Sequence, residues 1–312
     1  MVTLGEIEGF LVGHSADLTA ETGCTVILCP QGAVASAYTP GFAPGSRETE
    51  LLRPEGMVEI IHGLILTGGS AFGLAAADGV VRFLREKGLG LATPYQKVPC
   101  VAGAVIYDYP GNKSKGTLPD ALMGYRACQA AESGPVESGP AGVGTSAESG
   151  KLGGRDLSSP SGLGSFGVKT GDGLIMTALA AVNPLGSIVS PNTGAIISGL
   201  KTPKGNLATR TEILETLNSL AENNHPGQTV LVAVGTNARI NKLDAYRLAK
   251  MAGCGLARAV FPAHLLFDGD TVFALSTATG PTKDISYLGA LAAEVVSEAI
   301  VRSVPQSLNK AE

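Results

Sequence analysis

The sequence of 312 residues predicts a mixed α/β fold in which layers of β-sheet lie between helices. Three observations lead to this prediction. The strand-like segments are apolar along their whole length rather than at alternate positions, which is typical of sheets covered on both faces. Helical patterns fall between these segments without a strict βαβ rhythm. Charged residues make up only 16% of a chain with 42 glycines, which favours a compact, sheet-rich domain.

The N-terminal part of the chain contains three expected strands. Residues 24–28 and 33–38 look like two strands separated by a Pro-Gln-Gly turn. Residues 43–52 read as a polar loop, and residues 61–69 as a buried strand that ends in two glycines. The spacing of apolar residues changes from strand-like to helical directly after these glycines.

Helical spacing continues over residues 70–88, with Ser70 expected as the N-cap and Gly88 as the C-terminal stop. Residues 101–109 predict another strand, and residues 119–133 another helix.

The segment 134–173 is rich in Gly, Ser and Pro and is too long for an ordinary connection, so we expect it to be functional or locally structured. Residues 173–189 predict a buried strand, and residues 211–224 an amphipathic helix that ends before a His-Pro-Gly turn. An apolar strand then begins at Thr229. The remaining expected elements are a helix at 241–260, a strand at 270–277 and a long helix at 284–304. No repeat or break interrupts this order, so we expect a single domain over residues 1–312.

Composition excludes several classes of protein. The net charge of −4 gives no basis for binding nucleic acid or an anionic membrane. The N-terminus lacks the features of a signal peptide, and no run of about 18 apolar residues suggests a membrane span. The five cysteines are scattered without a CxxC motif, so we expect buried free thiols and a cytoplasmic protein.

Two glycine-rich motifs resemble nucleotide sites without fitting them. In GVGTSAESGK (142–151), Thr145 stands where a phosphate loop requires glycine, and Leu152 follows the lysine. GLGSFG (162–167) matches the dinucleotide pattern but follows a loop rather than a strand. The sequence therefore indicates no nucleotide cofactor.

The stretch GGSAF stands where a strand turns into a helix, as a nucleophile elbow does. The elbow requires glycine two residues after the serine, where Phe72 stands, so we favour Ser70 as a helix cap. A conventional serine hydrolase that uses Ser70 stays open as an alternative, without an obvious His/Asp pair to support it. The backbone amides of Gly68, Gly69 and Ser70 are candidates for binding a substrate carboxylate or carbonyl oxygen.

No metal site is expected. The four histidines are scattered, and no HxxxH, HExxH or Cys/His cluster occurs. FDGDTVF (267–273) does not continue as a calcium loop and reads as a turn before a strand.

Thr229 opens a strand directly after a turn-like segment, which suits a chain-terminal nucleophile. A threonine whose own α-amino group is free carries its general base with it, because that amine has a pKa of about 7.7–8.0. An internal threonine gains this amine only if the preceding peptide bond is cut. Its hydroxyl can cut that bond by attacking the carbonyl before it. On the residues alone, a threonine that simply favours a strand is the more common case.

Seven long blocks of the sequence stand out together: VGHSADLTAETGCTVILCPQGAVAS, APGSRETELL, HGLILTGGSAFGLAAADGVVRFL, AVIYDY, GVGTSAESGK, AAVNPLG and GLARAVFPAHLLFDGDTVFALST. These blocks resemble the DmpA-type L-aminopeptidase/D-esterase family, the self-processing group that includes β-peptidyl aminopeptidases and nylon-oligomer hydrolase. The resemblance implies an αββα four-layer sandwich of the DmpA/ArgJ-like kind, and cleavage between Gln228 and Thr229 into fragments 1–228 and 229–312.

The same resemblance implies roles for five further residues. Asn183 would donate to the oxyanion, and Lys151 would tune the nucleophile or stabilise negative charge. Tyr107 would line the site, and Asp268 and Asp270 would orient the new ammonium and hydroxyl. On the residues alone, the asparagine could be a turn residue, the lysine solvated and the tyrosine part of the core.

The implied activity is hydrolysis of an amide through an acyl-enzyme on Thr229, with no cofactor. The substrate would be a small peptide or amide, such as a β-amino acid peptide or a linear ω-amino oligomer. The resemblance also implies a homo-oligomer, a tetramer of processed heterodimers. Gln228 departs from the Asn or Gly that many relatives carry before the nucleophile. An unprocessed relative that binds a small amine or peptide without cleaving it therefore stays open.

Overall fold

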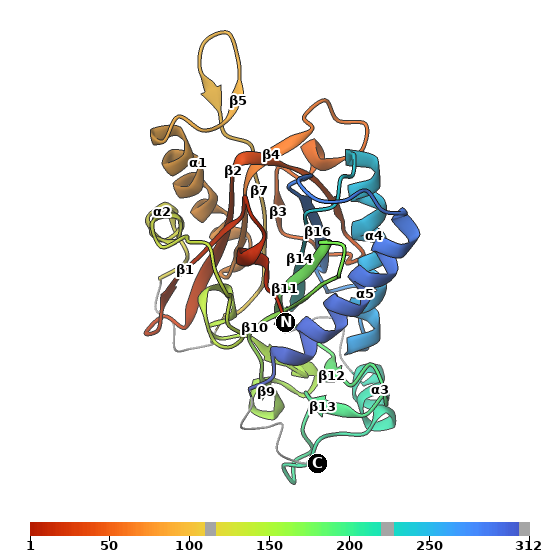
Figure 1. The fold of residues 1–312 in the computed structure, drawn as a ribbon. Helices are drawn as coiled ribbons and strands as arrows, with labels where there is room; N and C mark the ends of the chain where they lie inside the picture. The colour runs from red at the N-terminus through yellow and green to blue at the C-terminus, as the bar shows by residue number, and fades with distance from the viewer. Residues whose placement is uncertain (110–116, 220–227, 306–312) are drawn as a thin grey trace.

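The computed structural model describes residues 1–109, 117–219 and 228–305. Its centre is a nine-stranded mixed sheet in the order β10-β11-β14-β16-β2-β4-β7-β3, with β1 attached to β2 (Figure 1). The bounds of these strands are β1 Leu11–Asp17, β2 Thr22–Tyr38, β3 Ser46–Arg47, β4 Ile60–Thr67, β7 Val101–Val105, β10 Leu163–Lys169, β11 Ile175–Asn183, β14 Thr229–Thr236 and β16 Thr271–Ser276.

Strand β2 joins the two halves of this sheet. Its C-terminal part pairs with β16, and its N-terminal part pairs with β1 and β4. The pairing with β4 shifts register between Leu28 and Ala33, where Gly32 has a φ of 85°. The prediction of two separate strands was therefore wrong, because the Pro-Gln-Gly segment is an irregularity within one long strand that both neighbours hold in place.

The two halves of the sheet lie face to face and share one apolar core. Ile27, Leu64 and Leu66 of β2 and β4 belong to the same buried cluster as Leu231 of β14 and Phe273 of β16. Burial on this inner face accounts for one set of alternating side chains on each strand.

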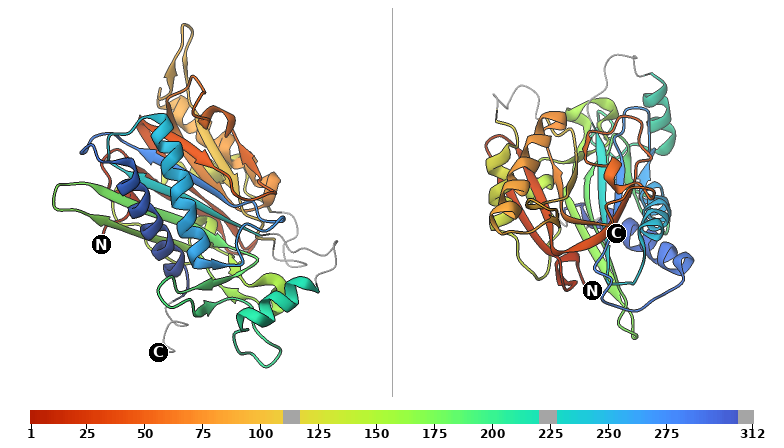
Figure 2. Two further views of the ribbon diagram at one scale, coloured as in Figure 1. Left: turned by 90° about the vertical axis from the view of Figure 1, so that its right-hand side faces the viewer. Right: turned by 90° about the horizontal axis from the view of Figure 1, so that it is seen from above.

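Helices cover the outer face of each half. Helices α1 (Ala76–Glu86) and α2 (Ala121–Gln129) pack on β2, β4 and β7. Helices α4 (Lys242–Ala259) and α5 (Ile285–Arg302) pack on β11, β14 and β16. The view from above in Figure 2 shows the resulting order of layers, helix–sheet–sheet–helix. The predicted αββα sandwich is confirmed, and it explains why all eight residues of β14 are buried.

Several helices have an N-terminal side-chain cap. Asp120, Asn241 and Asp284 accept backbone N–H bonds at the starts of α2, α4 and α5. The predicted N-cap at Ser70 was wrong. Ser70 opens the 3-10 helix η3 (Ser70–Ala75), which no side chain caps and which leads into α1.

Two other predicted elements differ in extent. The strand expected over 173–189 is two strands, because β11 ends at Asn183 before a proline and β12 (Ser187–Val189) joins another sheet with β13 (Ile196–Ser198) and β15 (Val260–Phe261). The helix expected over 211–224 is α3 (Arg210–Asn218), and its expected end and the His-Pro-Gly turn at 225–227 lie outside the described residues. The shorter elements are η1 Leu4–Glu6, η2 Glu50–Leu52, β5 Leu91–Ala92, β6 Lys97–Val98, η5 Gly142–Gly144, β8 Glu148–Ser149, η6 Lys151–Gly153, η7 Arg155–Leu157 and β9 Ser159–Pro160.

Two further expectations concern the surface. All five cysteines are free thiols, but Cys254 on α4 is exposed rather than buried as expected, because it faces away from the sheet. Within the described ranges, no helix combines the length and the apolar character that crossing a membrane requires.

Candidate active site

Strand register brings Thr229 and Asn183 side by side at one end of the sandwich. Strands β11 and β14 are antiparallel, and these two residues are direct partners at the last position of the ladder. Leu231 and Ala181, two residues away on the respective strands, face the core between the sheets. Because side chains alternate along a strand, Thr229 and Asn183 both point into the space between the two sheets.

Thr229 is 4% exposed, and its hydroxyl is held by the loop that precedes the neighbouring parallel strand, β16. The backbone N–H of Gly269 donates to Thr229 Oγ1 at 3.2 Å. A Cβ on Gly269 would lie 2.7 Å from that oxygen, so glycine is required for this approach. A backbone donor therefore already points at the oxygen of the predicted nucleophile.

The amide of Asn183 is fixed in one orientation by three partners. Its Oδ1 accepts from Lys151 Nζ at 2.6 Å and from the backbone N–H of Glu148 at 3.2 Å. Its Nδ2 donates to the carbonyl of Tyr107 at 2.9 Å. Since two donors face Oδ1 and an acceptor faces Nδ2, the reverse orientation of the amide is unfavourable.

Lys151 is buried, and none of the described carboxylates lies within ion-pair distance of its Nζ. Its Nζ also donates to the carbonyl of Asn183 at 2.9 Å. Burial lowers the pKa of Lys151 to about 7, although the charge of Glu148 opposes this shift. Gly150, which precedes the lysine with a φ of 75°, approaches Leu200 so closely that a Cβ would lie 1.8 Å from its backbone nitrogen. The motif that resembles a phosphate loop thus delivers a lysine with a lowered pKa to the asparagine.

Two aspartates follow on the loop before β16. Asp270 accepts from the backbone N–H of Val230 at 2.8 Å and lies 2.8 Å from His264 Nδ1. Asp268 Oδ2 accepts from the backbone N–H of Leu265 at 2.7 Å, while its buried Oδ1 has no hydrogen-bond partner among the described residues. Burial, and then the negative charge of Asp270, raise the pKa of Asp268 to about 7.

The segment after β7 reaches the site through its backbone. Tyr107 contacts Asn183 with its carbonyl, whereas its ring is 44% exposed and stacks on Tyr109 at 5.1 Å between centroids. Residues 106–109 were expected to continue the strand but lie outside it. The N–H of Ile106 donates to the carbonyl of Thr67 at the end of β4, so this segment bonds to both halves of the sandwich.

The turn at residues 68–70 is held by a buried carboxyl that the sequence did not single out. Asp108 accepts from the backbone N–H of Gly69 at 2.7 Å and from the hydroxyl of Thr22 at 2.8 Å. The N–H of Ser70 donates to the carbonyl of Ile106 at 3.0 Å. The amides of Gly69 and Ser70, which we expected to hold substrate, thus have protein acceptors in this structure.

The described histidines give Ser70 no partner. His14 bonds to Thr25, His62 lies beside the N–H of Cys100, and His264 pairs with Asp270. The fourth histidine, at position 225, lies outside the described residues.

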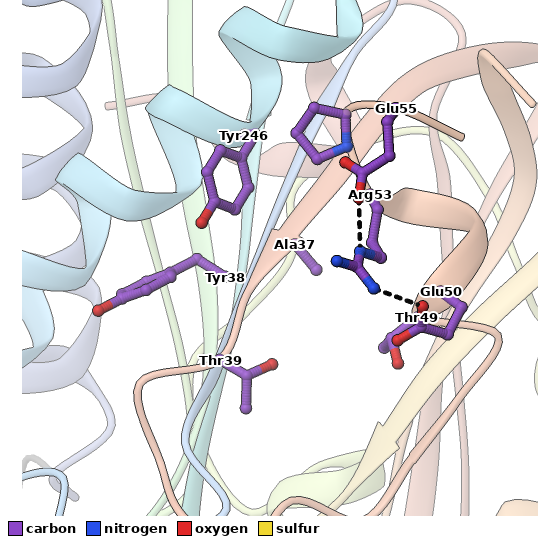
Figure 3. A pocket seen from close by; sticks show the side chains of 9 residues that line it. Ala37, Tyr38, Thr39, Thr49, Glu50, Arg53, Glu55 and Tyr246 are labelled. Atoms are coloured by element: carbon purple, nitrogen blue, oxygen red, sulfur yellow. Dashed lines mark hydrogen bonds and ion pairs between the residues drawn. The ribbon is translucent and has the colours of Figure 1, made fainter. Parts of the chain in front are cut away.

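A cavity of about 440 Å³ lies between the end of β2, the loop after β3 and α4 (Figure 3). Arg53 stands within it between Glu50 and Glu55, at 3.0 and 2.9 Å. Neither Thr229 nor Asn183 lines this cavity, so it is separate from the cluster described above.

Of the residues implied by the resemblance, the structure brings together Thr229, Asn183, Lys151 and the acids Asp268 and Asp270 at one end of the two sheets, with the backbone of Tyr107. The sequence did not single out Asp108, Glu148 and Arg155, whose charges act on Lys151, or His264, which bonds to Asp270. All four lie in or next to the quoted blocks, but no spacing rule separates them from their neighbours.

The comparisons with known proteins cover nearly the whole chain. A family model described as peptidase family S58 matches residues 3–310. An uncharacterized aminopeptidase of Mycobacterium bovis is 36% identical over 97% of this chain and 94% of its own. A 6-aminohexanoate-oligomer endohydrolase of Kocuria sp. is 30% identical over 96% of this chain and 84% of its own.

Solved structures show the same fold at low sequence identity. A β-aminopeptidase of Burkholderia sp. superimposes with a TM-score of 0.70 at 20% identity, over 96% of this chain and 85% of its own. The L-aminopeptidase D-Ala-esterase/amidase of Ochrobactrum anthropi, described as a variant of the Ntn hydrolase fold, gives a TM-score of 0.69 at 17% identity with the same coverage.

Proposed function

Because the chain belongs to peptidase family S58 and is a hydrolase of peptide or amide bonds, we propose that it is a self-processing enzyme whose nucleophile is Thr229. One observation carries this proposal. The predicted nucleophile and the predicted oxyanion donor, Asn183, are adjacent partners across β11 and β14, and Lys151 bonds to the asparagine.

Self-cleavage would proceed by transfer of an acyl group from nitrogen to oxygen. Thr229 Oγ1 attacks the carbonyl carbon of Gln228, and its proton passes to the neutral amine of Lys151. A new ester bond forms, the bond from Gln228 C to Thr229 N breaks, and the leaving nitrogen takes up the proton. Water then hydrolyses the ester and releases fragment 1–228 with a carboxylate. A lysine pKa of about 7 supports this role, because a large share of the amine is then neutral near pH 7.

Turnover would use the same oxygen with a new base. The free α-amine of Thr229 takes the hydroxyl proton while Oγ1 attacks the substrate carbonyl, an acyl-enzyme forms, the amine product leaves and water releases the acid. The N–H of Gly269 and the amide of Asn183 are the candidate donors to the oxyanion. A single such donor typically lowers the barrier by about 2.7–4 kcal/mol.

The unpartnered oxygen of Asp268 supports an amine at this place. In the part of the uncut chain that the structure describes, no donor reaches the buried Asp268 Oδ1, which is costly for a carboxyl group. Cleavage ahead of Thr229 would create an ammonium, with three N–H donors, next to this loop. The same carboxyl also suits the amino terminus of a bound substrate. Whether Asp268 binds the ammonium of Thr229 or that of the substrate, its replacement should lower the rate of turnover.

Two kinds of substrate fit this chemistry, and the relatives are named for both: aminopeptidases and a 6-aminohexanoate-oligomer endohydrolase. We propose short linear amides with a free amino group, either peptides or ω-amino oligomers. We further propose that the processed pair assembles into a homo-oligomer and acts in the cytoplasm without a cofactor.

Intact mass spectrometry of the purified protein tests the proposal directly. The wild-type chain and Thr229→Ser should yield fragments 1–228 and 229–312, and Thr229→Ala should remain a single chain. Thr236→Val, which alters a buried threonine later in the same strand, should still be cut. Hydrolysis of aminoacyl p-nitroanilides and of the linear 6-aminohexanoate dimer should follow the extent of cleavage. Turnover by uncut Thr229→Ala would refute the mechanism, and a wild-type chain that stays whole would favour the non-catalytic binder.

A further inference from the structure

The ion pair between Arg155 and Glu148 lies next to the site but has no role in the mechanism proposed above. Arg155 Nε donates to Glu148 Oε2 at 2.8 Å, and the two side chains are 30% and 26% exposed. Glu148 belongs to β8 and Arg155 begins the 3-10 helix η7, so both come from the glycine-rich segment that also carries Lys151.

The pair is connected to both ends of the Asn183 amide. On one end, the backbone N–H of Glu148 donates to Asn183 Oδ1. On the other end, Asn183 Nδ2 donates to the carbonyl of Tyr107, and Arg155 Nη1 donates to the carbonyl of Tyr109, two residues further along the same segment. The guanidinium of Arg155 thus bonds to both backbone segments that hold the Asn183 amide, the one at Glu148 and the one at Tyr107–Tyr109.

From this arrangement we propose that Arg155, through Glu148 and Tyr109, is a positioning residue for the reaction at Thr229, because it sets the orientation of the Asn183 amide. The inference rests on the proposed function of Thr229. Arginine suits the task because its planar fork donates in two directions at once, to a carboxylate and to a carbonyl. Lysine has a single terminal nitrogen and cannot span both acceptors in the same geometry.

The pair also acts on Lys151 through its charges. The carboxylate of Glu148 raises the pKa of Lys151, and the guanidinium of Arg155 lowers it. Asp268 and Asp108 are the other charged groups that face the lysine, and both raise its pKa. Removal of Arg155 should therefore move the lysine pKa upward, and removal of the Glu148 charge should move it downward.

These opposite effects separate positioning from a purely structural role. A pair that only stabilised the fold would lower the melting temperature on removal of either partner. It would not shift the pH dependence of cleavage in opposite directions, and added guanidinium would not restore the rate.

The experiment compares Arg155→Met, Arg155→Lys and Glu148→Gln with a matched control, Arg53→Met. Arg53 is also an arginine paired with glutamates, but it lies in the separate cavity of Figure 3. For each variant, intact mass spectrometry follows the rate of self-cleavage against pH. Steady-state kinetics on an aminoacyl p-nitroanilide that the wild type hydrolyses then gives kcat and KM per cleaved chain.

For Arg155→Met we expect cleavage and kcat to fall about 10- to 100-fold with KM nearly unchanged, since a small displacement of a catalytic group costs about this much. Guanidinium chloride at low millimolar concentration should restore part of the rate. Arg155→Lys should recover less than half of the loss. The acid limb of the cleavage profile should move to higher pH in Arg155→Met and to lower pH in Glu148→Gln.

The inference would be overturned if Arg155→Met had the same rates and pH profile as Arg53→Met. It would also be overturned if Arg155→Met were slow but the acid limb of its cleavage profile did not move and guanidinium did not restore the rate. A wild-type chain that is neither cut nor active would instead refute the proposed function, and this inference with it.

Discussion

Replacing Lys151 by Met should stabilise the uncut chain near neutral pH while abolishing its cleavage. The pKa of this lysine falls from 10.5 to about 7 on burial. Between pH 7 and pH 10.5, Lys151 is protonated in the unfolded chain but largely neutral in the folded chain. Stability therefore rises with pH by up to about 1.4 kcal/mol per pH unit, from a penalty of about 4 kcal/mol at pH 7.

Methionine removes this penalty together with two hydrogen bonds to Asn183, which contribute about 1–1.5 kcal/mol each. The net gain should be about 2 kcal/mol at pH 7 and about zero at pH 9. Asp268 responds in the same sense, because Lys151 lowers its pKa and loss of the lysine raises it further. The methionine variant then loses additional stability as pH rises above 7.

Urea unfolding of Thr229→Ala and Thr229→Ala/Lys151→Met at several pH values between about 6 and 9 measures this difference on chains that stay whole. Lys283→Met in the same background is the control. Its ion pair with Asp172 raises the pKa of Lys283 above 10.5, so its effect should be constant over this range. A stability difference for Lys151→Met that is equally flat from pH 7 to 9 would refute the conclusion that the lysine is buried neutral.

Three other substitutions test single contacts. Gln228→Met in the uncut background should raise the free energy of unfolding by about 1–3 kcal/mol, because the buried side-chain amide of Gln228 has no partner within the described ranges; an unchanged urea midpoint would contradict this. Gly150→Ala should lower the melting temperature and slow cleavage, because its Cβ would meet Leu200 and the positive φ adds strain of about 1–3 kcal/mol; cleavage at the wild-type rate would argue against it. His264→Ala removes the 2.8 Å bond between the imidazole and Asp270 Oδ2 and leaves the 3.3 Å contact with the backbone N–H of residue 264. It should slow cleavage and lower the free energy of unfolding by about 1.5–3 kcal/mol, the usual contribution of a hydrogen bond to a charged group. Timed mass spectrometry measures the first effect and thermal unfolding the second.

The layers of the fold could be predicted from the sequence because they depend on which segments are buried, and runs of apolar residues indicate this directly. The strand from Thr229 is apolar at nearly every position, and a strand buried on both faces has to read this way. The continuity of β2 could not be predicted, because Pro30-Gln31-Gly32 has the local chemistry of a turn. Only pairing with distant strands keeps this segment extended.

The site could be predicted only in part, for a related reason. Thr229 and Asn183 meet through the register of two strands that are 46 residues apart in the chain, and no local pattern encodes that register. The resemblance to a known family pointed to Thr229 and Asn183, but it predicted no role for Glu148 or Arg155. Their importance lies in backbone groups and in a salt bridge within an irregular segment, where residue type alone carries little information.

The location of the polar cluster follows from the sandwich itself. Along most of β14 every side chain faces one of two dry cores, where an amide, an ammonium or a carboxyl would be costly without partners. At the strand ends, backbone N–H groups that are not used by the sheet become available, and those of Gly269, Leu265 and Glu148 bond to the threonine, an aspartate and the asparagine of the site. These donors make a buried polar cluster tolerable, and the one from Gly269 reaches the oxygen of the proposed nucleophile. The oxygen that they leave without a partner is Asp268 Oδ1, and in the proposed reaction the new amino group of Thr229 supplies the missing donor.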